Sequence, residues 1–439
     1  MTDKLDQILI SSSQPDFQKQ IKNLHEKLLR KARFGGPEEE PVWEIIRNVT
    51  KRGDEAVAEY TEEFDGVKLT PKQFRVSAEE LKKAHKEVDA DLMASIRQAI
   101  KNVRKYQEEI FIANKKANQH PMIKYTPIKR IGICVPGASA PLPSTVIMCA
   151  VPAQVAGVKE IVVVSPPKYR GSIHPVILAV CHELGINEVY RIGGAQAVAA
   201  LAFGTQTITP VNKIVGPGNQ WVQMAKRKVF GVVDIDSIAG PSEVLIIADD
   251  SANPTWIAAD MLSQAEHSPG SAVLFTDSKE IANKVLSELK KQLEVLDRKR
   301  ETSECILKYS RIIIFKDFEE VVTQANFFAS EHLEVQCGED SRKIAERIDN
   351  AGAIFIGDYS PVAVGDYWAG PSHTLPTGAT AKFFSALSAN DFIKSTSIIE
   401  YDKKKLAESA EDIIRLAEAE GLDAHAKSIR LRLGLRRDE

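Results

Sequence analysis

The chain has 439 residues, with 57 Lys or Arg against 60 Asp or Glu, so its formal net charge is −3. This balance gives no electrostatic reason to expect a nucleic acid or another polyanion as a partner. Hydrophobic residues make up 44% and charged residues 27% of the chain, which excludes a disordered protein and is typical of a globular enzyme that acts on small molecules.

The five cysteines are widely scattered and never spaced as CxxC. Neither a disulfide framework nor a thiolate zinc site is therefore expected, and a reducing cytoplasm suits the chain best. The first residues show no basic stretch followed by an apolar run, and no window approaches the roughly 18 apolar residues of a membrane span. We expect no export signal and no membrane anchor.

The first 125 residues are predicted to be a helical scaffold. Residues 16–33 and 42–64 carry apolar positions three and four apart among many charges, as amphipathic helices do. Ser77 and Glu80 form a capping box at the start of a further helix over residues 78–88.

From Arg130 onward, short apolar runs alternate with helical stretches and with Gly or Pro. One series covers residues 131–219, and a second runs from residue 244 to residue 358. Such alternation is the signature of βαβ units around a buried parallel sheet, so we expect two α/β units in tandem. The tail after residue 402 is predicted to form two helices separated at Gly421.

Three glycine-rich loops follow predicted strands: Pro136 to Ser139, Gly193 to Gln196, and Gly216 to Asn219. Glycine lets backbone amides approach a phosphate, and ligands of open parallel sheets bind beyond the carboxyl ends of the strands. None of the loops matches GxGxxG, and each alone is compatible with a simple tight turn. Together they favour a phosphate-bearing ligand, with Gln196 and Asn219 offering amide groups to it.

Gln264 and His267 lie three residues apart near the end of a predicted helix, so both can address one point. Oxygen and imidazole ligands suit Zn²⁺ or Mn²⁺, although an isolated pair is also compatible with a polar surface patch.

Further along, Glu331 and His332 offer two adjacent groups that can transfer protons near neutral pH. Asp366 and His373 lie in a stretch rich in Gly, Pro and aromatic residues that is predicted to be an ordered loop, where function concentrates. Glu420 and His425 flank Gly421, where a capping or surface role is the alternative.

Several long runs of this chain resemble the histidinol dehydrogenase family. The matching runs include PSTVIMCAVPAQVAGV, GGAQAVAALAFGT, KIVGPGN, AGPSEVLIIADDSANPTWIAADMLSQAEH, SEHLEV, GDYWAGPSHTLPTG and AEAEGLDAHA. They appear in the order found in the family, from about residue 40 to the C-terminus.

The resemblance implies oxidation of L-histidinol through histidinaldehyde to L-histidine, the last step of histidine biosynthesis, with two NAD⁺ reduced at one site. It implies a Zn²⁺ ion held by Gln264, His267, Asp366 and His425. The same four residues and Ser242, His332 and Glu420 would bind the substrate. His425 and Glu420 would reach the site from the partner subunit of a homodimer.

The resemblance also implies that position 134, with Gln196 and Asn219, contacts NAD⁺. Cys134 stands where the family usually has Tyr, Ala138 where it has Gly, and Ser330 where it has Pro. Loss of an aromatic ring would weaken stacking against the cofactor. The thiol of Cys134 could be interpreted as a covalent nucleophile, but cysteines at strand ends are usually small buried hydrophobes.

In chemical terms, His332 is the candidate base for the hydroxyl proton, and Glu331 the candidate base that activates water for the aldehyde hydrate.

The expected fold is α/β, with two tandem incomplete Rossmann-like domains with parallel sheets, a helical N-terminal segment and a small helical C-terminal domain. The expected boundaries are as follows: an N-terminal helical extension over 1–30, a metal-carrying α/β domain from 31–132 with 244–385, an NAD-contacting α/β domain over 133–243, and a helical dimerisation domain over 386–439.

Two other functions fit parts of the sequence. A paralogue of the same fold could oxidise another primary alcohol, such as a sulfonated diol. A metal-dependent hydrolase would use the metal and a water-activating Glu, but would leave the glycine loops unexplained. A non-catalytic interaction protein fits least, because every proposed ligand and base is present.

Overall fold

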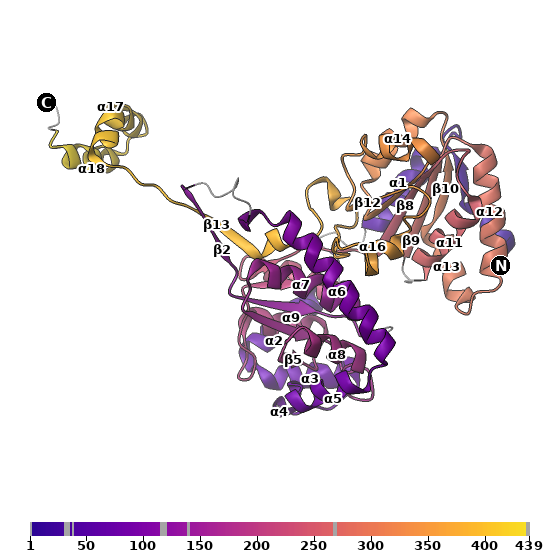
Figure 1. Ribbon diagram of the computed structural model, residues 1–439, viewed down its shortest axis with the longest axis horizontal. Helices are drawn as coiled ribbons and strands as arrows, with labels where there is room; N and C mark the ends of the chain where they lie inside the picture. Colours follow the sequence, from indigo (N-terminus) through magenta and orange to yellow (C-terminus); the bar gives the residue numbers. More distant parts are fainter. Residues whose placement is uncertain are drawn as a thin grey trace. The chain divides into compact units, whose positions relative to one another are not determined.

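The computed structural model describes residues 2–29, 36, 39–114, 121–137, 141–266 and 270–435. Its contacts divide the chain into two compact units, Met1–Phe111 with Pro127–Ile393, and Ile112–Thr126 with Lys394–Glu439. The first unit contains one five-stranded and one six-stranded parallel sheet (Figure 1). The predicted α/β fold with two parallel sheets is therefore confirmed.

The five-stranded sheet has the strand order β5-β4-β3-β6-β7. Its strands are β3 (Arg130–Cys134), β4 (Glu160–Val164), β5 (Glu188–Tyr190), β6 (Lys213–Val215) and β7 (Asp234–Ile235). The crossovers include α7 (Pro143–Ala156), α8 (Pro175–Glu183), α9 (Gly194–Phe203) and α10 (Gln220–Val229). Helix α7 is buried along nearly its whole length, as expected for a helix that is apolar on every side.

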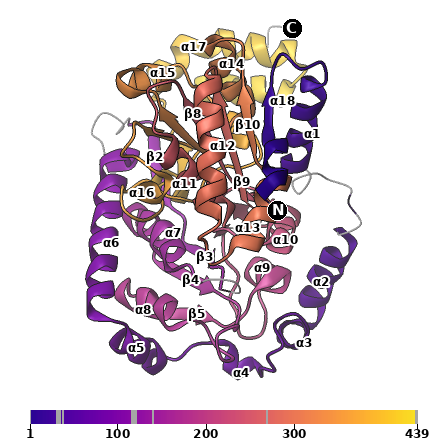
Figure 2. The same cartoon turned by 90° about the vertical axis from the view of Figure 1, so that its right-hand side faces the viewer.

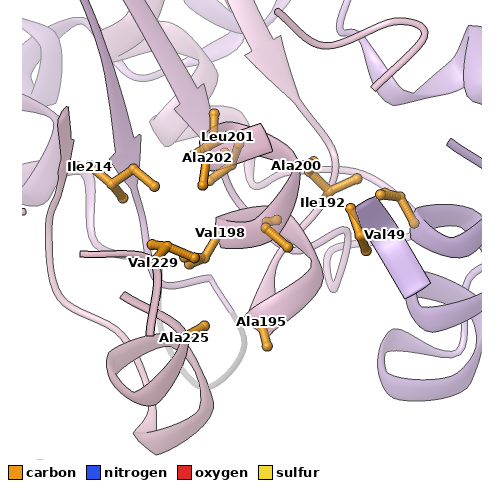
Figure 3. Packing of buried hydrophobic residues seen from close by; sticks show 14 of the residues in the cluster. Val49, Ile192, Ala195, Val198, Ala200, Leu201, Ala202, Ile214, Ala225 and Val229 are labelled. Carbon is orange, nitrogen blue, oxygen red and sulfur yellow. The ribbon is translucent and has the colours of Figure 1, made fainter. Parts of the chain in front are cut away.

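The core beside this sheet includes side chains from the N-terminal helices (Figure 3). Val49 lies in the same buried cluster as Ile192, Val198 and Ile214. The N-terminal helices are α2 (Glu39–Arg52), α3 (Asp54–Asp65), α4 (Pro71–Phe74), α5 (Ala78–Glu87) and α6 (Ala90–Ile110). Helix α2 packs on α9, α5 on α8, and α6 on α7. These helices thus group with the five-stranded sheet, whereas the boundaries expected from the sequence joined 31–132 to 244–385.

The six-stranded sheet has the order β1-β10-β9-β8-β11-β12. Its strands are β1 (Leu9–Ser11), β8 (Ser242–Ala248), β9 (Gly270–Thr276), β10 (Arg311–Ile314), β11 (His332–Gln336) and β12 (Ala353–Ile356). Strand β11 lies between β8 and β12, and His332 is paired with Val244 and with Ala353.

Helices cover both faces of the six-stranded sheet, as a parallel sheet requires (Figure 2). One face packs against α11 (Pro254–Ala265), α12 (Lys279–Leu293) and α13 (Lys299–Tyr309). The other face packs against α1 (Phe17–Leu29), α14 (Phe318–Phe328) and α15 (Ser341–Ala345). The short helix α16 (Val362–Tyr367) follows β12.

The N-terminal segment is more than a helical extension. A 3-10 helix over Thr2–Ile8 precedes β1, and Leu9 of β1 pairs with Ile312 of β10. This strand was not predicted, because its three residues show no periodicity and it is stabilised by a pairing that is distant in sequence.

The second unit contains two helices, α17 (Lys403–Ala419) and α18 (Asp423–Leu433), which pack on each other. Most of a two-stranded sheet of β2 (Ile123–Pro127) and β13 (Ile393–Ser397) also belongs to it.

Short 3-10 helices occur in both units. Ile112–Asn114 belongs to the second unit, and Gly338–Asp340, Thr380–Lys382 and Ala389–Phe392 belong to the first. In the described part of the chain, no helix combines the length and the apolar character that crossing a membrane requires.

Candidate active site

A cavity of about 510 Å³ lies in the first unit and is lined from both of its sheets. One wall is the loop that follows β6, from Gly216 to Asn219, with the start of α10. The cavity is also lined by Ser242 at the start of β8, by His332 at the start of β11 and by Glu331, the residue before it. The cavity therefore lies at the carboxyl end of one sheet and at the amino end of the other.

Glu331 and His332 are 7% and 3% exposed and are held by the neighbouring strand β8. Oε2 of Glu331 accepts hydrogen bonds from Oγ of Ser242 at 2.7 Å and from the backbone N–H of Glu243 at 2.8 Å. Nδ1 of His332 lies 3.1 Å from the carbonyl oxygen of Glu243 and 3.5 Å from Oε2 of Glu331. Because a carbonyl can only accept, Nδ1 of His332 carries a hydrogen, and in the neutral ring Nε2 is the atom that can take up a proton.

The charges of this cluster shift its pKa values. Burial raises the pKa of Glu331. Burial alone would lower the pKa of His332, but the nearby charges of Glu331 and Asp366 outweigh it and raise this pKa to about 9. Burial and the charge of Glu331 raise the pKa of Glu243 to about 8. Carboxyl groups that share so dry a site with an imidazole are typical of proton-transfer chemistry.

Asp366 and His373 line the same cavities as His332, but Asp366 lies in a helix and not in the ordered loop that the sequence predicted. Asp366 is on α16, and its Oδ1 lies 3.7 Å from Nε2 of His332. His332, Asp366 and His373 line the main cavity and also a neighbouring cavity of about 310 Å³. Within the described residues, Nε2 of His332 has no hydrogen-bond partner.

Gln264 lies at the carboxyl end of α11 and is 1% exposed. Helix α11 packs on the sheet face that carries Val244, and His332 is the strand partner of Val244. The side chains of Val244 and His332 therefore point to the sheet face that α11 covers. Nε2 of Gln264 has no hydrogen-bond partner in the described part of the chain. His267, the second predicted ligand of this pair, lies outside the described residues.

The predicted cofactor residues lie at the carboxyl end of the five-stranded sheet. Asn219 lines the cavity and caps α10, since its Oδ1 accepts the N–H groups of Trp221 and Val222 at 3.1 Å each. Gln196, near the start of α9, is fully buried, and neither atom of its amide has a hydrogen-bond partner among the described residues. Cys134 is 5% exposed and packs in the core, and burial raises the pKa of its thiol to about 12. Ala138 lies outside the described residues.

A buried ion pair that was not predicted joins Lys226 and Asp236, whose side chains are 1% and 4% exposed. Asp236 lines the cavity, and its Oδ2 accepts the N–H of Gly216 at 2.6 Å. Nζ of Lys226 donates to the carbonyl oxygen of Gly216 at 2.9 Å. The pair thus holds both backbone groups of the residue that begins the glycine loop.

The buried Glu243 was missed as well. Its Oε1 accepts the N–H of Gly378 at 2.9 Å and ties the loop after His373 to β8. A glutamate inside the apolar run SEVLIIA was a usable signal, because an acid in a buried strand needs partners. Asp236 and Lys226 carry no comparable signal, since charged residues are ordinary in their surroundings.

Glu420 and His425 belong to the second compact unit, and both are exposed. Glu420 is the C-cap residue of α17, and His425 lies in the first turn of α18. Their part in the site remains a prediction.

The family model described as histidinol dehydrogenase matches residues 30–433 of this chain. The chain belongs to the histidinol dehydrogenase family. Histidinol dehydrogenase from Rhodopirellula baltica is 47% identical over 397 residues, which are 90% of this chain and 86% of that one. The enzyme from Geobacillus kaustophilus is 47% identical over 412 residues, 92% of this chain and 96% of that one. A crystal structure of histidinol dehydrogenase from Elizabethkingia anophelis matches with a TM-score of 0.88 and 35% identity, covering 97% and 98% of the two chains.

As a histidinol dehydrogenase, the chain is an oxidoreductase, so a metal and a dinucleotide are the groups to test against its residues. No cluster of three or more His, Cys, Asp or Glu side chains suited to a metal ion occurs in the described ranges. The carboxylate of Asp366 and the amide oxygen of the buried Gln264 are donors of the type that Zn²⁺ or Mn²⁺ accepts. These donors fit a divalent ion but make only part of a site.

Proposed function

We propose that the chain oxidises L-histidinol to L-histidine in two steps, with NAD⁺ as the electron acceptor and Zn²⁺ as the metal. The observation that carries this proposal is the shared cavity, in which Glu331, His332 and Asp366 face the loop from Gly216 to Asn219. Membership of the histidinol dehydrogenase family supports the substrate and its place in histidine biosynthesis.

In the first oxidation, the neutral ring of His332 would take the proton of the substrate hydroxyl at Nε2, and bound NAD⁺ would accept the hydride from the same carbon. Because the pKa of His332 is raised to about 9, the neutral ring is populated mainly at alkaline pH, so this oxidation should accelerate as the pH rises toward that value. The bond from Nδ1 of His332 to the carbonyl of Glu243 fixes the tautomer that leaves Nε2 able to accept. Ser242 and the backbone of Glu243 orient the carboxylate of Glu331.

In the second oxidation, Glu331 takes a proton from water as the water adds to the aldehyde carbon, and the hydrate then loses a hydride to a second NAD⁺. Both steps need a dry site that holds the reacting groups in place. The burial of Glu331 and His332 supplies it.

Gln264, His267 and Asp366, with the partner subunit's His425, would hold Zn²⁺. When bound, the ion supplies a template for the substrate's nitrogen atoms and a positive charge beside His332. Ser242 and the partner subunit's Glu420 would help to hold the substrate. Asn219 and Gln196 would contact NAD⁺, whereas the buried Cys134 offers no aromatic surface for stacking, so we expect a weaker cofactor complex than an aromatic residue would allow.

The test is NADH formation by the purified protein with histidinol, with and without a chelator. We expect two NADH for each histidinol consumed, and loss of activity with the chelator that added Zn²⁺ restores. No NADH with any divalent metal would overturn the proposal. NADH from another primary alcohol but not from histidinol would favour the paralogue with a different substrate.

A mixing experiment tests the homodimer. Measured as histidine formation, Glu331→Gln and His425→Ala homodimers should each be inactive, because each lacks one part of every site that both oxidations require. Random mixing of the two variants gives half heterodimers with one intact site in two, so roughly a quarter of wild-type activity should return. No recovery would show that the second unit does not act across subunits.

A further inference from the structure

Glu334 is a buried carboxyl that none of the steps above uses. It lies two residues after His332 in β11 and is 1% exposed. Because side chains alternate along a strand, Glu334 and His332 point to the same face of the sheet. That face is the one covered by α11, since the strand partners of these two residues, Ile246 and Val244, pack against that helix.

The carboxyl of Glu334 is bonded to three separate elements. Its Oε1 accepts the backbone N–H of Val362, the first residue of α16, at 3.0 Å. Its Oε2 accepts Nε2 of Gln336 on its own strand at 2.9 Å. It is also hydrogen-bonded to the carboxyl of Asp260 on α11, and Nε2 of Gln336 donates to Oδ2 of Asp260 at 3.1 Å.

Each of these elements carries one residue of the proposed site. Asp366 lies four residues after Val362 in α16. Gln264 lies four residues after Asp260 in α11, about one helical turn further along the same face. His332 lies on the strand itself. One side chain therefore ties together the three elements that carry His332, Asp366 and Gln264.

We propose that Glu334 is a positioning residue that sets the relative placement of β11, α11 and α16, and so brings Asp366 and Gln264 to one point beside His332. The inference rests on the proposed function only in taking these three residues to act together. The bond to Val362 is the strongest part of the argument, because the first N–H groups of a helix have no partner inside the helix and orient it when they are bonded elsewhere.

The protonation of Glu334 agrees with this role. Burial and the charge of Asp260 raise the pKa of Glu334 to about 8, so the neutral carboxyl can donate to Asp260 and accept from Val362. A glutamine has the same shape: it can accept from Val362 with Oε1 and donate to Asp260 with Nε2, and it gives up only the bond accepted from Gln336 on the same strand. A leucine fills similar space but can do neither.

The experiment compares Glu334→Gln and Glu334→Leu in the full chain by Zn²⁺ titration against a chromophoric chelator, with kcat and KM for histidinol measured on the same samples. Groups that orient metal ligands typically contribute 10–100-fold to metal affinity, so we expect Glu334→Leu to bind Zn²⁺ about 10–100-fold more weakly and to lose kcat. Glu334→Gln should remain close to wild type in both.

Two further variants separate positioning from folding. Val362→Pro removes the N–H that Glu334 accepts and replaces the buried Val362 side chain by another apolar one, at the helix position where Pro is best tolerated. It should therefore weaken Zn²⁺ binding even if Glu334→Leu does not fold. Glu188→Leu removes a carboxyl of the five-stranded sheet that is bonded to Arg130 and Tyr190, and it should lower stability without changing Zn²⁺ affinity.

Wild-type Zn²⁺ affinity in folded Glu334→Leu and in Val362→Pro would overturn the proposal, and so would a Glu334→Gln variant as impaired as Glu334→Leu. The Zn²⁺ titration does not depend on turnover. A wild-type protein that binds Zn²⁺ but does not oxidise histidinol would therefore refute the proposed function and still leave the role of Glu334 decided by the variants.

Discussion

Replacing Gly216 by alanine tests how tightly the glycine loop of the cavity is held. Gly216 has a φ of +102°, a region that residues with a Cβ rarely adopt. A Cβ at this position would lie 2.4 Å from the carbonyl oxygen of Cys134, which is backbone and cannot rotate away. The loop cannot yield easily either, because Asp236 and Lys226 hold the N–H and carbonyl of Gly216.

The cost has two parts that a second glycine separates. Gly231 has nearly the same φ, +99°, but a Cβ there would meet nothing within 4 Å. Backbone strain alone should therefore lower the unfolding free energy of Gly231→Ala, by about 1–3 kcal/mol. In Gly216→Ala the same strain and the overpacking should act together, and the overpacking should lower the unfolding free energy by about 1–3 kcal/mol more.

The assay is urea unfolding of the two variants and the wild type, with KM for NAD⁺ and for histidinol measured in parallel. We expect the larger loss of unfolding free energy for Gly216→Ala, together with a raised KM for NAD⁺ in this variant only, because Asn219 is carried by the same loop. Equal losses for the two variants, or an unchanged KM for NAD⁺ in Gly216→Ala, would refute the idea that the loop is rigidly held against β3.

Three further predictions concern buried charges. Asp236→Asn should cost about 3–5 kcal/mol of unfolding free energy, because Lys226 is 1% exposed and loses its counter-ion. Adding Lys226→Met should recover most of this loss. If urea unfolding shows no recovery, the loss does not come from an unpaired, buried Lys226. Glu331→Gln should suppress histidinaldehyde oxidation but largely spare its reduction by NADH, measured by stopped-flow absorbance; equal loss in both directions would show that Glu331 does not activate water. Burial and the charge of Glu331 raise the pKa of Glu243 from 4.5 to about 8. Between pH 4.5 and pH 8 the folded protein therefore holds a proton on Glu243 that the unfolded chain has released, so wild-type stability should fall as the pH rises through this window. Glu243→Gln should gain stability over wild type across the same window, and a difference that does not vary with pH would argue against a buried neutral Glu243.

The spacing of apolar residues predicted most of the helices and strands, because this spacing reflects which side chains are buried. The apolar runs at 131–134, 160–164, 244–248 and 271–276 are strands, and the capping box of Ser77 and Glu80 is present at the start of α5. The predicted helix over 42–64 is two helices, because Gly53 has a φ of +59° between α2 and α3. Which sheet each N-terminal helix covers was not predictable, since an amphipathic face looks the same whatever it packs against.

The site was predicted by residue type more than by geometry. The expectation that ligands lie beyond the carboxyl ends of strands holds for Gly216 to Asn219 after β6. It fails for Ser242 and His332, which begin β8 and β11. The end of α11 lies on the sheet face that carries His332, and the order of residues along the chain does not reveal such an approach.

The pairing of β1 with β10 also has a consequence for how the protein is made. Leu9 emerges from the ribosome about 300 residues before its partner Ile312, so the strand synthesised first is among the last to be paired. Until then β1 has no partner strand, and a protein without β1 would leave the edge of β10 open, which can template pairing with another chain. Removing residues 2–11 should therefore leave a folded but aggregation-prone protein, even though the histidinol dehydrogenase match begins only at residue 30.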